Sequence, residues 1–487
     1  MKRVVIIGGG AAGLAGALAL RRAADAGAPV EWVLLEKDDR LGGKILTERH
    51  DGFIIDGGPD CYLSEKQWVG QIASRLGIVD RLLPSNDAEK RTFIYARGRL
   101  HELPDGIMMM VPTKFLPLAT TSLFSWPAKL RMALDLVILK ALDGADETLG
   151  SFVRRRLGRE CLDLLAEPMV GGVHASDPEQ MSLRATFPRF LDMEQRYGSL
   201  IRAFLAARRK TPPRSPAGAG AVAQTYFMTF QGGMQELTDA MADAAGQQQM
   251  RTGRQVVAIE EQTAERRYLL RIADGGRYEA DAVLVSSEAY HAARFLHGMD
   301  GELARLLDQV AWSSAATVSL AYRRDRLGHD LHGFGFLVPA VARRRIMAST
   351  WSSTKWPGRA PEGFALIRAF VGGPHNGALV ELDDATMIAM VREELRAIMG
   401  IAAEPEFGRV YRWPKGMPQY TLGHLDRLAA IERRLAGHPG LFLCGASYRG
   451  VGMGDCINSA EQAAQKALAL LFDHALPTTV GRQPTTP

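Results

Sequence analysis

The feature that most constrains the fold lies at the N-terminus, where a glycine-rich run, residues 8–13 (GGGAAG), directly follows an apolar segment, residues 3–7. We expect residues 3–7 to form a buried parallel strand, residues 11–24 to form a helix rich in Ala and Leu, and residues 30–35 to form the next strand. This order of strand, glycine turn, helix and strand is a βαβ unit of the usual length.

The glycines are spaced as a dinucleotide site requires. Gly8 permits the tight turn, Gly10 lets the backbone approach a pyrophosphate, and Gly13 lets the helix and strand pack closely. The helix N-terminus then faces the phosphates with free N–H groups and a partial positive charge. Glu36, at the end of the second strand, places a carboxylate where it accepts hydrogen bonds from a ribose. The pattern therefore predicts a dinucleotide-binding site.

Bulk properties narrow the class further. A chain of 487 residues, 47% hydrophobic and 23% charged, favours two or three globular domains. The net charge of +5 is too small to favour nucleic acid as a partner. The four cysteines form no CxxC pair and the histidines show no metal-ligand spacing, so we expect reduced thiols, a cytoplasmic protein and no metal.

No apolar run in the sequence reaches the length of about 18 residues that a membrane-spanning helix needs. Residues 114–129 are the best candidate for contact with a membrane surface, or for lining an apolar pocket.

Two further glycine turns follow the acidic residue, at residues 40–44 (RLGGK) and 56–59 (DGGP). Near the C-terminus, residues 441–446 predict a strand that leads into a glycine-rich loop, and we expect Asp455 to cap a helix over residues 456–471. These elements resemble those of the large FAD family that contains amine oxidases, phytoene desaturases and porphyrinogen oxidases. The resemblance implies that the C-terminal helix and its loop meet the flavin.

Several segments resemble the oxygen-dependent porphyrinogen oxidases more narrowly, and their order spans residues 3–472. These are Gly57 to Asp60 with Leu63 and Lys66, Leu103-Pro104-x-Gly106, Phe334 to Pro339, Trp351 to Gly363, Trp413 to Tyr420 with Gly423-His424, and Gly445 to Gly452. The chain is identified as a member of this group on their order and spacing together. The resemblance implies six-electron oxidation of a porphyrinogen to a porphyrin, in two-electron steps at one flavin, with oxygen as acceptor and hydrogen peroxide as product.

The resemblance also implies site residues. The expected cofactor contacts are Gly8, Gly9, Gly10, Ala11, Ala12, Gly13, Glu36, Lys37, Arg40, Gly43, Lys44, Gly58, Pro59, Asp60, Cys61, Val257, Trp413, Ala446, Val451, Gly452 and Met453. The expected substrate contacts are Phe334, Gly335 and Leu337, with Lys66 as a candidate cation. Lys66 lies among polar residues, and a solvent-exposed helix face explains it equally well. We expect no dedicated acid–base side chain, because the cofactor performs the electron transfer.

One segment bears on the choice of porphyrinogen. The protoporphyrinogen enzymes of animals carry an arginine shortly after the Leu-Pro-x-Gly element, whereas this chain has residues 107–113 (IMMMVPT) there. That form resembles the bacterial branch that oxidises coproporphyrinogen III, whose four carboxylates call for more cationic anchors. The sequence leaves open coproporphyrinogen III and protoporphyrinogen IX. It also leaves open an amine oxidase, a carotenoid-type desaturase and a flavin-binding scaffold without turnover.

The expected fold class is α/β, with a doubly wound, Rossmann-like FAD domain, a mixed-sheet substrate domain and a helical insertion. We assign residues 1–66, 222–290 and 413–475 to the FAD domain, and residues 67–107 and 291–412 to the substrate domain. Residues 108–221 form the helical insertion, a candidate for peripheral membrane contact, and residues 476–487 a disordered tail. We expect a monomer or a homodimer.

Overall fold

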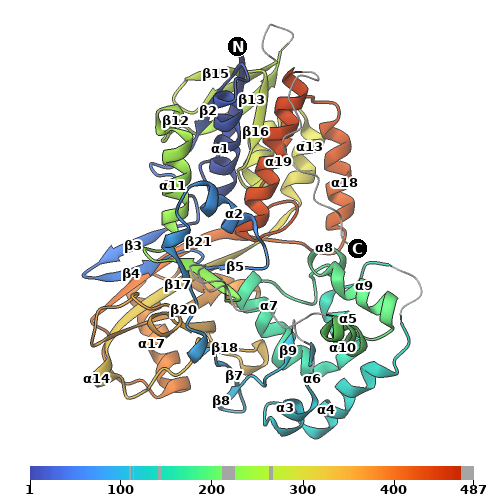
Figure 1. The fold of residues 1–487 in the computed structure, drawn as a ribbon, viewed down its shortest axis with the longest axis vertical. Coiled ribbons are helices and arrows are strands. Elements are labelled where there is room, and N and C mark those ends of the chain that lie inside the picture. Colours follow the sequence, from blue (N-terminus) through green and yellow to red (C-terminus); the bar gives the residue numbers. More distant parts are fainter. Residues whose placement is uncertain (109–110, 113, 141–144, 211–224, 263–266, 473–487) are drawn as a thin grey trace.

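The computed structural model describes residues 1–108, 111–112, 114–140, 145–210, 225–262 and 267–472. One end of the molecule, which carries the N-terminus, is built on a parallel five-stranded sheet, and the other end holds a larger sheet and a group of helices (Figure 1). The predicted tail, residues 476–487, lies outside the described residues. The α/β fold class is confirmed.

The parallel sheet has the strand order β12-β2-β1-β16-β22, and its strands come from distant parts of the chain. Their bounds are β1 Lys2–Ile7, β2 Val30–Leu35, β12 Met250–Arg251, β16 Ala282–Val285 and β22 Leu441–Leu443. Because the side chains of a strand alternate between faces, Val4 and Ile6 pack on one side of β1, while Val5 and Ile7 pack on the other. Both faces are therefore buried, which explains the uninterrupted apolar sequence of β1.

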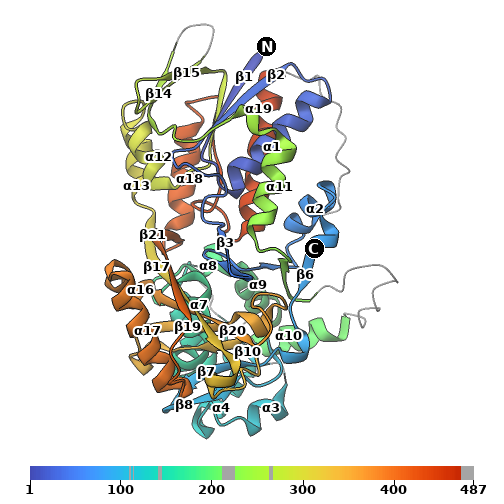
Figure 2. The same ribbon diagram turned by 90° about the vertical axis from the view of Figure 1, so that its left-hand side faces the viewer.

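Helices cover one face of this sheet, and a small antiparallel sheet with more helices covers the other (Figure 2). The first face carries α1 (Ala11–Asp25), α2 (Trp68–Arg75), α11 (Gln235–Ala245) and α19 (Met453–Phe472). The second carries β13 (Val256–Glu261), β14 (Tyr268–Ile272), β15 (Arg277–Ala280), α12 (Ala289–Leu296), α13 (Gly301–Asp308) and α18 (His424–Leu435).

These packing partners shift the expected domain boundaries. We expected the second domain to begin at residues 67 and 291, yet α2 packs in the core with α1 and α19, and α12 with α13 packs below the small sheet. At the other boundary, β21 (Phe407–Gln419) belongs to the larger sheet throughout, beyond the expected limit at residue 413. Helices α2, α12 and α13 occupy these positions because their apolar faces are buried there. The local sequence pattern shows that a helix has an apolar face, but it does not show which distant surface will cover that face.

The larger sheet has seven strands in the order β21-β17-β20-β19-β18-β7-β8. Their remaining bounds are β7 Thr92–Ala96, β8 Arg99–Glu102, β17 Ala311–Arg323, β18 Gly335–Leu337, β19 Ile346–Trp351 and β20 Phe364–Gly372. All neighbours pair antiparallel except β18 and β7, so the sheet is mixed as expected. One face packs on α17 (Asp384–Met399) through Val318, Leu320 and Ile367.

The insertion after β8 is mainly helical and has its own apolar core, which includes Phe152, Leu165 and Phe190. It contains β9 Ile107–Met108, β10 Val111–Pro112, α3 Phe115–Thr120, α4 Trp126–Ala133, α5 Leu149–Leu157, α6 Arg159–Cys161, α7 Glu167–His174, α8 Leu183–Thr186, α9 Pro188–Tyr197 and α10 Leu200–Lys210. Helices α3 and α4 lie at the end of the molecule opposite the parallel sheet (Figures 1 and 2).

Candidate active site

The glycine turn, residues 8–13, joins β1 to α1 with no room for side chains at two positions. Gly8 has φ +104°, a conformation that favours glycine. A Cβ on Gly13 would lie 1.8 Å from the carbonyl oxygen of Gly8. The start of α1 is therefore pressed against the end of β1, which directs the helix N-terminus across the edge of the sheet.

Gly10 differs, because a Cβ there would meet only the Cα of Gly43, at 3.9 Å. The second glycine segment closes on the first, since the N–H of Gly42 donates to the carbonyl oxygen of Gly9 at 2.8 Å. Arg40 donates to the carbonyl oxygens of Leu41 and Ile45, both at 3.1 Å, and so holds its own loop in shape. The space beside Gly10 suits a ligand that approaches the backbone closely.

Glu36 directly follows β2 and is attached to the glycine turn. Its Oε2 accepts from the N–H of Gly9 at 2.5 Å, and its Oε1 accepts from the N–H of Asp38 at 2.9 Å. Burial raises the pKa of Glu36, while these two amides oppose the rise. Lys37 pairs with Asp38 at 2.7 Å on the surface. Val257 lies in β13, shortly after Arg254, whose N–H donates to the carbonyl oxygen of Glu36 at 2.7 Å.

The C-terminal loop meets the glycine turn from the other side, since a Cβ on Gly445 would lie 3.6 Å from the Cβ of Ala12. Tyr420 donates its hydroxyl to the carbonyl oxygen of Ala446 at 2.6 Å. Its ring stacks on that of His424, with centroids 4.1 Å apart. The Nε2 of His424 is 2.8 Å from the carbonyl oxygen of Tyr448. Two side chains thus fix the backbone of this loop.

Helix α19 begins at Met453, so Val451 and Gly452 lie just before it. We expected Asp455 to be the N-cap of a helix from residue 456, and that expectation was wrong. Asp455 lies in the first turn and forms an ion pair with Lys66. Lys44 likewise pairs with Glu288, at 2.7 Å.

The residues around the glycine turn fit a dinucleotide cofactor. The N-termini of α1 and α19 both lie at this edge of the sheet, and the region beside Gly10 is open to a pyrophosphate. The hydroxyl of Ser287 is buried beside Gly8 and has no hydrogen-bond partner in the described part of the chain. Orphaned polar atoms of this kind are ordinarily satisfied by a ligand or water.

The Gly57 turn, residues 57–61, carries the next predicted residues and packs against the larger sheet. The carbonyl oxygen of Gly57 accepts from Thr317 Oγ1 and from Trp413 Nε1, both at 2.9 Å. A Cβ on Gly58 would lie 1.7 Å from the carbonyl oxygen of Lys44. Trp413 therefore binds the backbone of this turn, which contacts residues of both domains.

Asp60 is the centre of a cluster that sequence analysis did not identify. The Asp60 cluster consists of Asp60, Cys61, Lys355, Trp356 and Arg368. Asp60 accepts from Trp356 Nε1 at 3.0 Å, and it lies 3.3 Å from Lys355 Nζ and 3.9 Å from Arg368 Nη1. Although burial opposes it, the two cations hold the pKa of Asp60 well below its usual range. Burial raises the pKa of the Cys61 thiol to about 12.

A sequence signal for this cluster does exist. Arg368 interrupts the otherwise apolar run FALIRAFVGG, and Lys355 stands between Trp351 and Trp356. A cation in a buried strand ordinarily has a partner or a function. The sequence does not show the partner, because Asp60 lies in the other domain.

Two of the predicted substrate residues, Gly335 and Leu337, share a sheet face with Arg368. Gly335, Thr350 and Arg368 are directly opposite one another across β18, β19 and β20. Leu337 lies in the next row on the same face, with Phe370. The opposite face packs on α17. The face with Arg368 is covered by the Gly57 turn near β17 and by the insertion near β18, where a Cβ on Gly172 of α7 would lie 2.8 Å from Leu337 Cδ2.

Phe334 immediately precedes β18 and is half-buried. Its N–H donates to the carbonyl oxygen of Arg91 at 2.7 Å, and its carbonyl oxygen accepts from the N–H of Trp351 at 2.9 Å. The structure therefore brings Gly335 and Leu337 to the same sheet face as Trp413, while Lys66 lies at the start of α19. Gly335 and Leu337 therefore belong to the larger sheet, whereas Lys66 pairs with the first turn of α19.

A glycine turn for a dinucleotide, joined through the Gly57 turn to a mixed second sheet, defines a two-domain flavin-dependent oxidoreductase. Residues 11–468 match the family described as flavin containing amine oxidoreductase, so the chain belongs to that family, whose cofactor is a flavin. The predicted family is confirmed.

Relatives and solved structures agree with this assignment. The chain is 36% identical to the coproporphyrinogen III oxidase of Bacillus subtilis (strain 168), over 97% of this chain and 99% of that protein. It is 30% identical to the chloroplastic protoporphyrinogen oxidase 1 of Spinacia oleracea, over 97% and 85%. A crystal structure of a protein from Exiguobacterium sp. 255-15, named as a protoporphyrinogen oxidase, is 32% identical, with a TM-score of 0.83 and coverage of 96% and 98%.

Proposed function

We propose that this protein is an FAD- and oxygen-dependent oxidase that converts coproporphyrinogen III to coproporphyrin III in haem biosynthesis. The observation that carries the choice is the full-length similarity, at 31–36% identity, to three proteins named coproporphyrinogen III oxidase. The plant proteins named protoporphyrinogen oxidase are 25–30% identical, and the Exiguobacterium protein of that name is 32% identical. The reaction removes six electrons and six protons from the substrate, and three molecules of oxygen become three of hydrogen peroxide.

The protein's part in this reaction is binding, orientation and electrostatics. FAD, when bound, supplies the two-electron chemistry and the reaction with oxygen. Residues 8–13, Glu36 and the start of α19 would hold it. The Gly57 turn connects the cofactor region to the larger sheet, because the carbonyl oxygen of Gly57 accepts from Thr317 and Trp413 of that sheet. A flat, largely apolar macrocycle suits a site with a few polar anchors, such as the sheet face that carries Gly335 and Leu337.

The first experiment supplies the purified protein with coproporphyrinogen III and protoporphyrinogen IX separately, in air, and follows porphyrin fluorescence. Faster growth with coproporphyrinogen III, with three equivalents of peroxide per porphyrin, is expected. Faster growth with protoporphyrinogen IX would overturn the choice of substrate. A flavin-loaded protein that oxidises neither would overturn the porphyrinogen assignment itself, and amines would then be tested as substrates.

We further propose that this cytoplasmic protein contacts a membrane surface peripherally through its insertion. No helix in the described residues is long and apolar enough to cross a bilayer. Five large apolar side chains in the segment from α3 to residue 139 are nevertheless exposed, and we call them the apolar tip: Leu116 (75% exposed), Trp126 (66%), Leu130 (67%), Val137 (70%) and Leu139 (88%).

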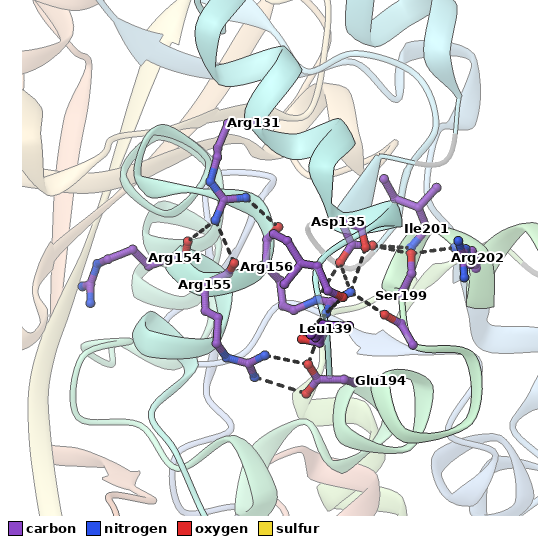
Figure 3. Close-up of polar contacts among 12 residues, drawn as sticks. Arg131, Asp135, Leu139, Arg154, Arg155, Arg156, Glu194, Ser199, Ile201 and Arg202 are labelled. Atoms are coloured by element: carbon purple, nitrogen blue, oxygen red, sulfur yellow. Dashed lines mark hydrogen bonds and ion pairs between the residues drawn. The ribbon is translucent and has the colours of Figure 1, made fainter. Parts of the chain in front are cut away.

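The base of the apolar tip is rigid. Arg156, which is fully buried, donates to Asp135 Oδ1 at 2.7 Å and to the carbonyl oxygen of Ile138 at 3.0 Å (Figure 3). Asp135 also accepts from Ser199 at 2.6 Å. Exposed apolar side chains held on a fixed backbone are typical of an interaction surface. Lys114 and Lys140 flank the tip and favour anionic lipids.

Flotation with vesicles tests this contact. The protein should float with vesicles that contain anionic lipid and less with zwitterionic ones, and the triple variant Trp126→Ser, Leu130→Ser, Leu139→Ser should remain unbound. The matched control is Val341→Ser with Leu470→Ser, two exposed apolar residues outside the insertion. Equal flotation of the triple variant and the native protein would overturn the proposal.

A further inference from the structure

The Asp60 cluster contains more positive than negative charge. Lys355 and Arg368 supply two cations, and within the described parts of the chain Asp60 is the only carboxylate within ion-pair distance of either. Their side chains are 9% and 4% exposed. Other cations nearby form one-to-one pairs: Lys44 with Glu288, Lys66 with Asp455, and Arg359 with Asp56.

An uncompensated cation in such a buried place is costly unless a second anion arrives. The thiol of Cys61, 3.6 Å from Lys355 Nζ, stays neutral because burial raises its pKa to about 12. The Nε of Arg368 is buried and has no hydrogen-bond partner among the residues that the structure describes. Asp60 is the most exposed of the three charged groups, at 18%. The cluster therefore has both the charge and an unused donor for one more carboxylate.

The cations are also held in place. The ammonium of Lys355 lies over the rings of Phe227 and Trp356, at 4.7 and 4.8 Å from their centroids. Arg368 donates to the carbonyl oxygens of Gly57 and Gly58. A fixed pair of donors loses little conformational entropy when a ligand binds, in contrast to lysines on a surface.

The Asp60 cluster lies next to residues that are predicted to contact the substrate. Arg368 shares a row with Gly335 across the sheet, on the face that the Gly57 turn and the insertion cover. Lys355 follows β19 directly, in the short helix α15 (Ser352–Lys355). The two cations of the cluster thus belong to the larger sheet and the helix that follows β19.

We propose that Lys355 and Arg368 bind a carboxylate of the porphyrinogen and favour a tetracarboxylate over a dicarboxylate. This inference rests on the proposed function. A tetracarboxylate carries a carboxylate on each of its four rings, so one meets the cluster in any orientation of the macrocycle. A dicarboxylate carries its two on neighbouring rings, so only some orientations bring a carboxylate to the cluster. The two residues are specificity-determining and take no part in electron transfer.

The test is Lys355→Met, which removes the charge and keeps the length of the side chain. Loss of a charge-assisted contact should raise KM for coproporphyrinogen III about tenfold or more, with kcat nearly unchanged. KM for protoporphyrinogen IX should change much less. Equilibrium binding of the two porphyrin products, followed by quenching of tryptophan fluorescence in the flavin-loaded protein, should show the same difference without turnover.

Two variants control for folding. Lys129→Met removes another buried lysine, in the insertion, and should leave both substrates unaffected. If Lys355→Met does not fold because Asp60 loses its nearer cation, the double variant Lys355→Met, Asp60→Asn removes both charges and should still lose the preference. Equal weakening for both porphyrins, or an effect on kcat alone, would overturn the inference. Failure of the native protein to oxidise either substrate would instead overturn the proposed function.

Discussion

The N–H of Gly9 donates to Glu36 Oε2 at 2.5 Å, so the acidic residue at the end of β2 is attached directly to the glycine turn between β1 and α1. The two halves of the dinucleotide motif, separate in the sequence, are one hydrogen-bonded unit. The close packing of this unit requires residues without side chains in the turn, because a Cβ on Gly13 would lie 1.8 Å from the carbonyl oxygen of Gly8.

Gly10→Val should reduce flavin occupancy strongly. The added side chain would enter the space between Gly10 and Gly43, where the pyrophosphate is expected, while φ at residue 10 is −75° and permits valine. The ratio of flavin to protein absorbance in the purified variant measures the effect. Gly298→Val is the control, because a Cβ added at that glycine would meet no other atom within 4 Å. Full occupancy in Gly10→Val would disprove the assignment of the turn.

Lys66→Ala should raise KM for coproporphyrinogen III more than KM for protoporphyrinogen IX, because the tetracarboxylate presents more carboxylates to this cation. The ion pair with Asp455 already balances part of its charge, so we expect a smaller effect than for Lys355→Met. Asp455→Asn is the complementary variant, and it should lower KM for the tetracarboxylate. Equal effects of Lys66→Ala on both substrates would remove Lys66 from this role.

Stability should fall in mild acid partly through His424. Burial lowers the pKa of His424 to about 4, from 6.5 in an unfolded chain. The folded state therefore binds fewer protons than the unfolded state between these values. The contribution is complete above pH 6.5 and is lost toward pH 4, by about 1.4 kcal/mol per pH unit.

Thermal melting at pH 5, 6 and 7 checks this dependence. His424→Gln removes the titrating group, so its melting temperature should vary less with pH than that of the native protein. His297→Gln, at an exposed position, should keep the native dependence. Parallel pH profiles for His424→Gln and the native protein would argue against the role of His424.

Arg156→Ala should destabilise the insertion by about 3–5 kcal/mol, because Asp135 and Glu194 would be left buried with fewer partners. Hydrogen exchange should accelerate in α5, α9 and α10, while the glycine turn keeps its protection and its flavin. Arg159→Ala, at an exposed arginine of the same region, is the control. Uniform acceleration of hydrogen exchange throughout the chain would show that the contacts of Arg156 stabilise the whole molecule and not the insertion alone.

Local sequence determined the dinucleotide half of this protein well. The positions of β1, α1 and β2 and the roles of Gly8 and Gly13 follow from side-chain size, apolar continuity and backbone freedom, which are properties of neighbouring residues. The run LFLCGA also predicted β22 and the loop after it. The start of α19 was missed, since nothing local shows that Asp455 pairs with Lys66 rather than capping the helix.

Tertiary structure alone decided the rest. Asp60 comes from the first domain, while Lys355 and Arg368 come from the second, and their charges interact only because the two domains bury them together. The observed domain boundaries differ from the expected ones for the same reason. The sequence pattern shows that α2 and α12 each have an apolar face, but it does not show on which surface that face packs. Sequence determines which groups are available, and burial of distant surfaces decides which of them meet.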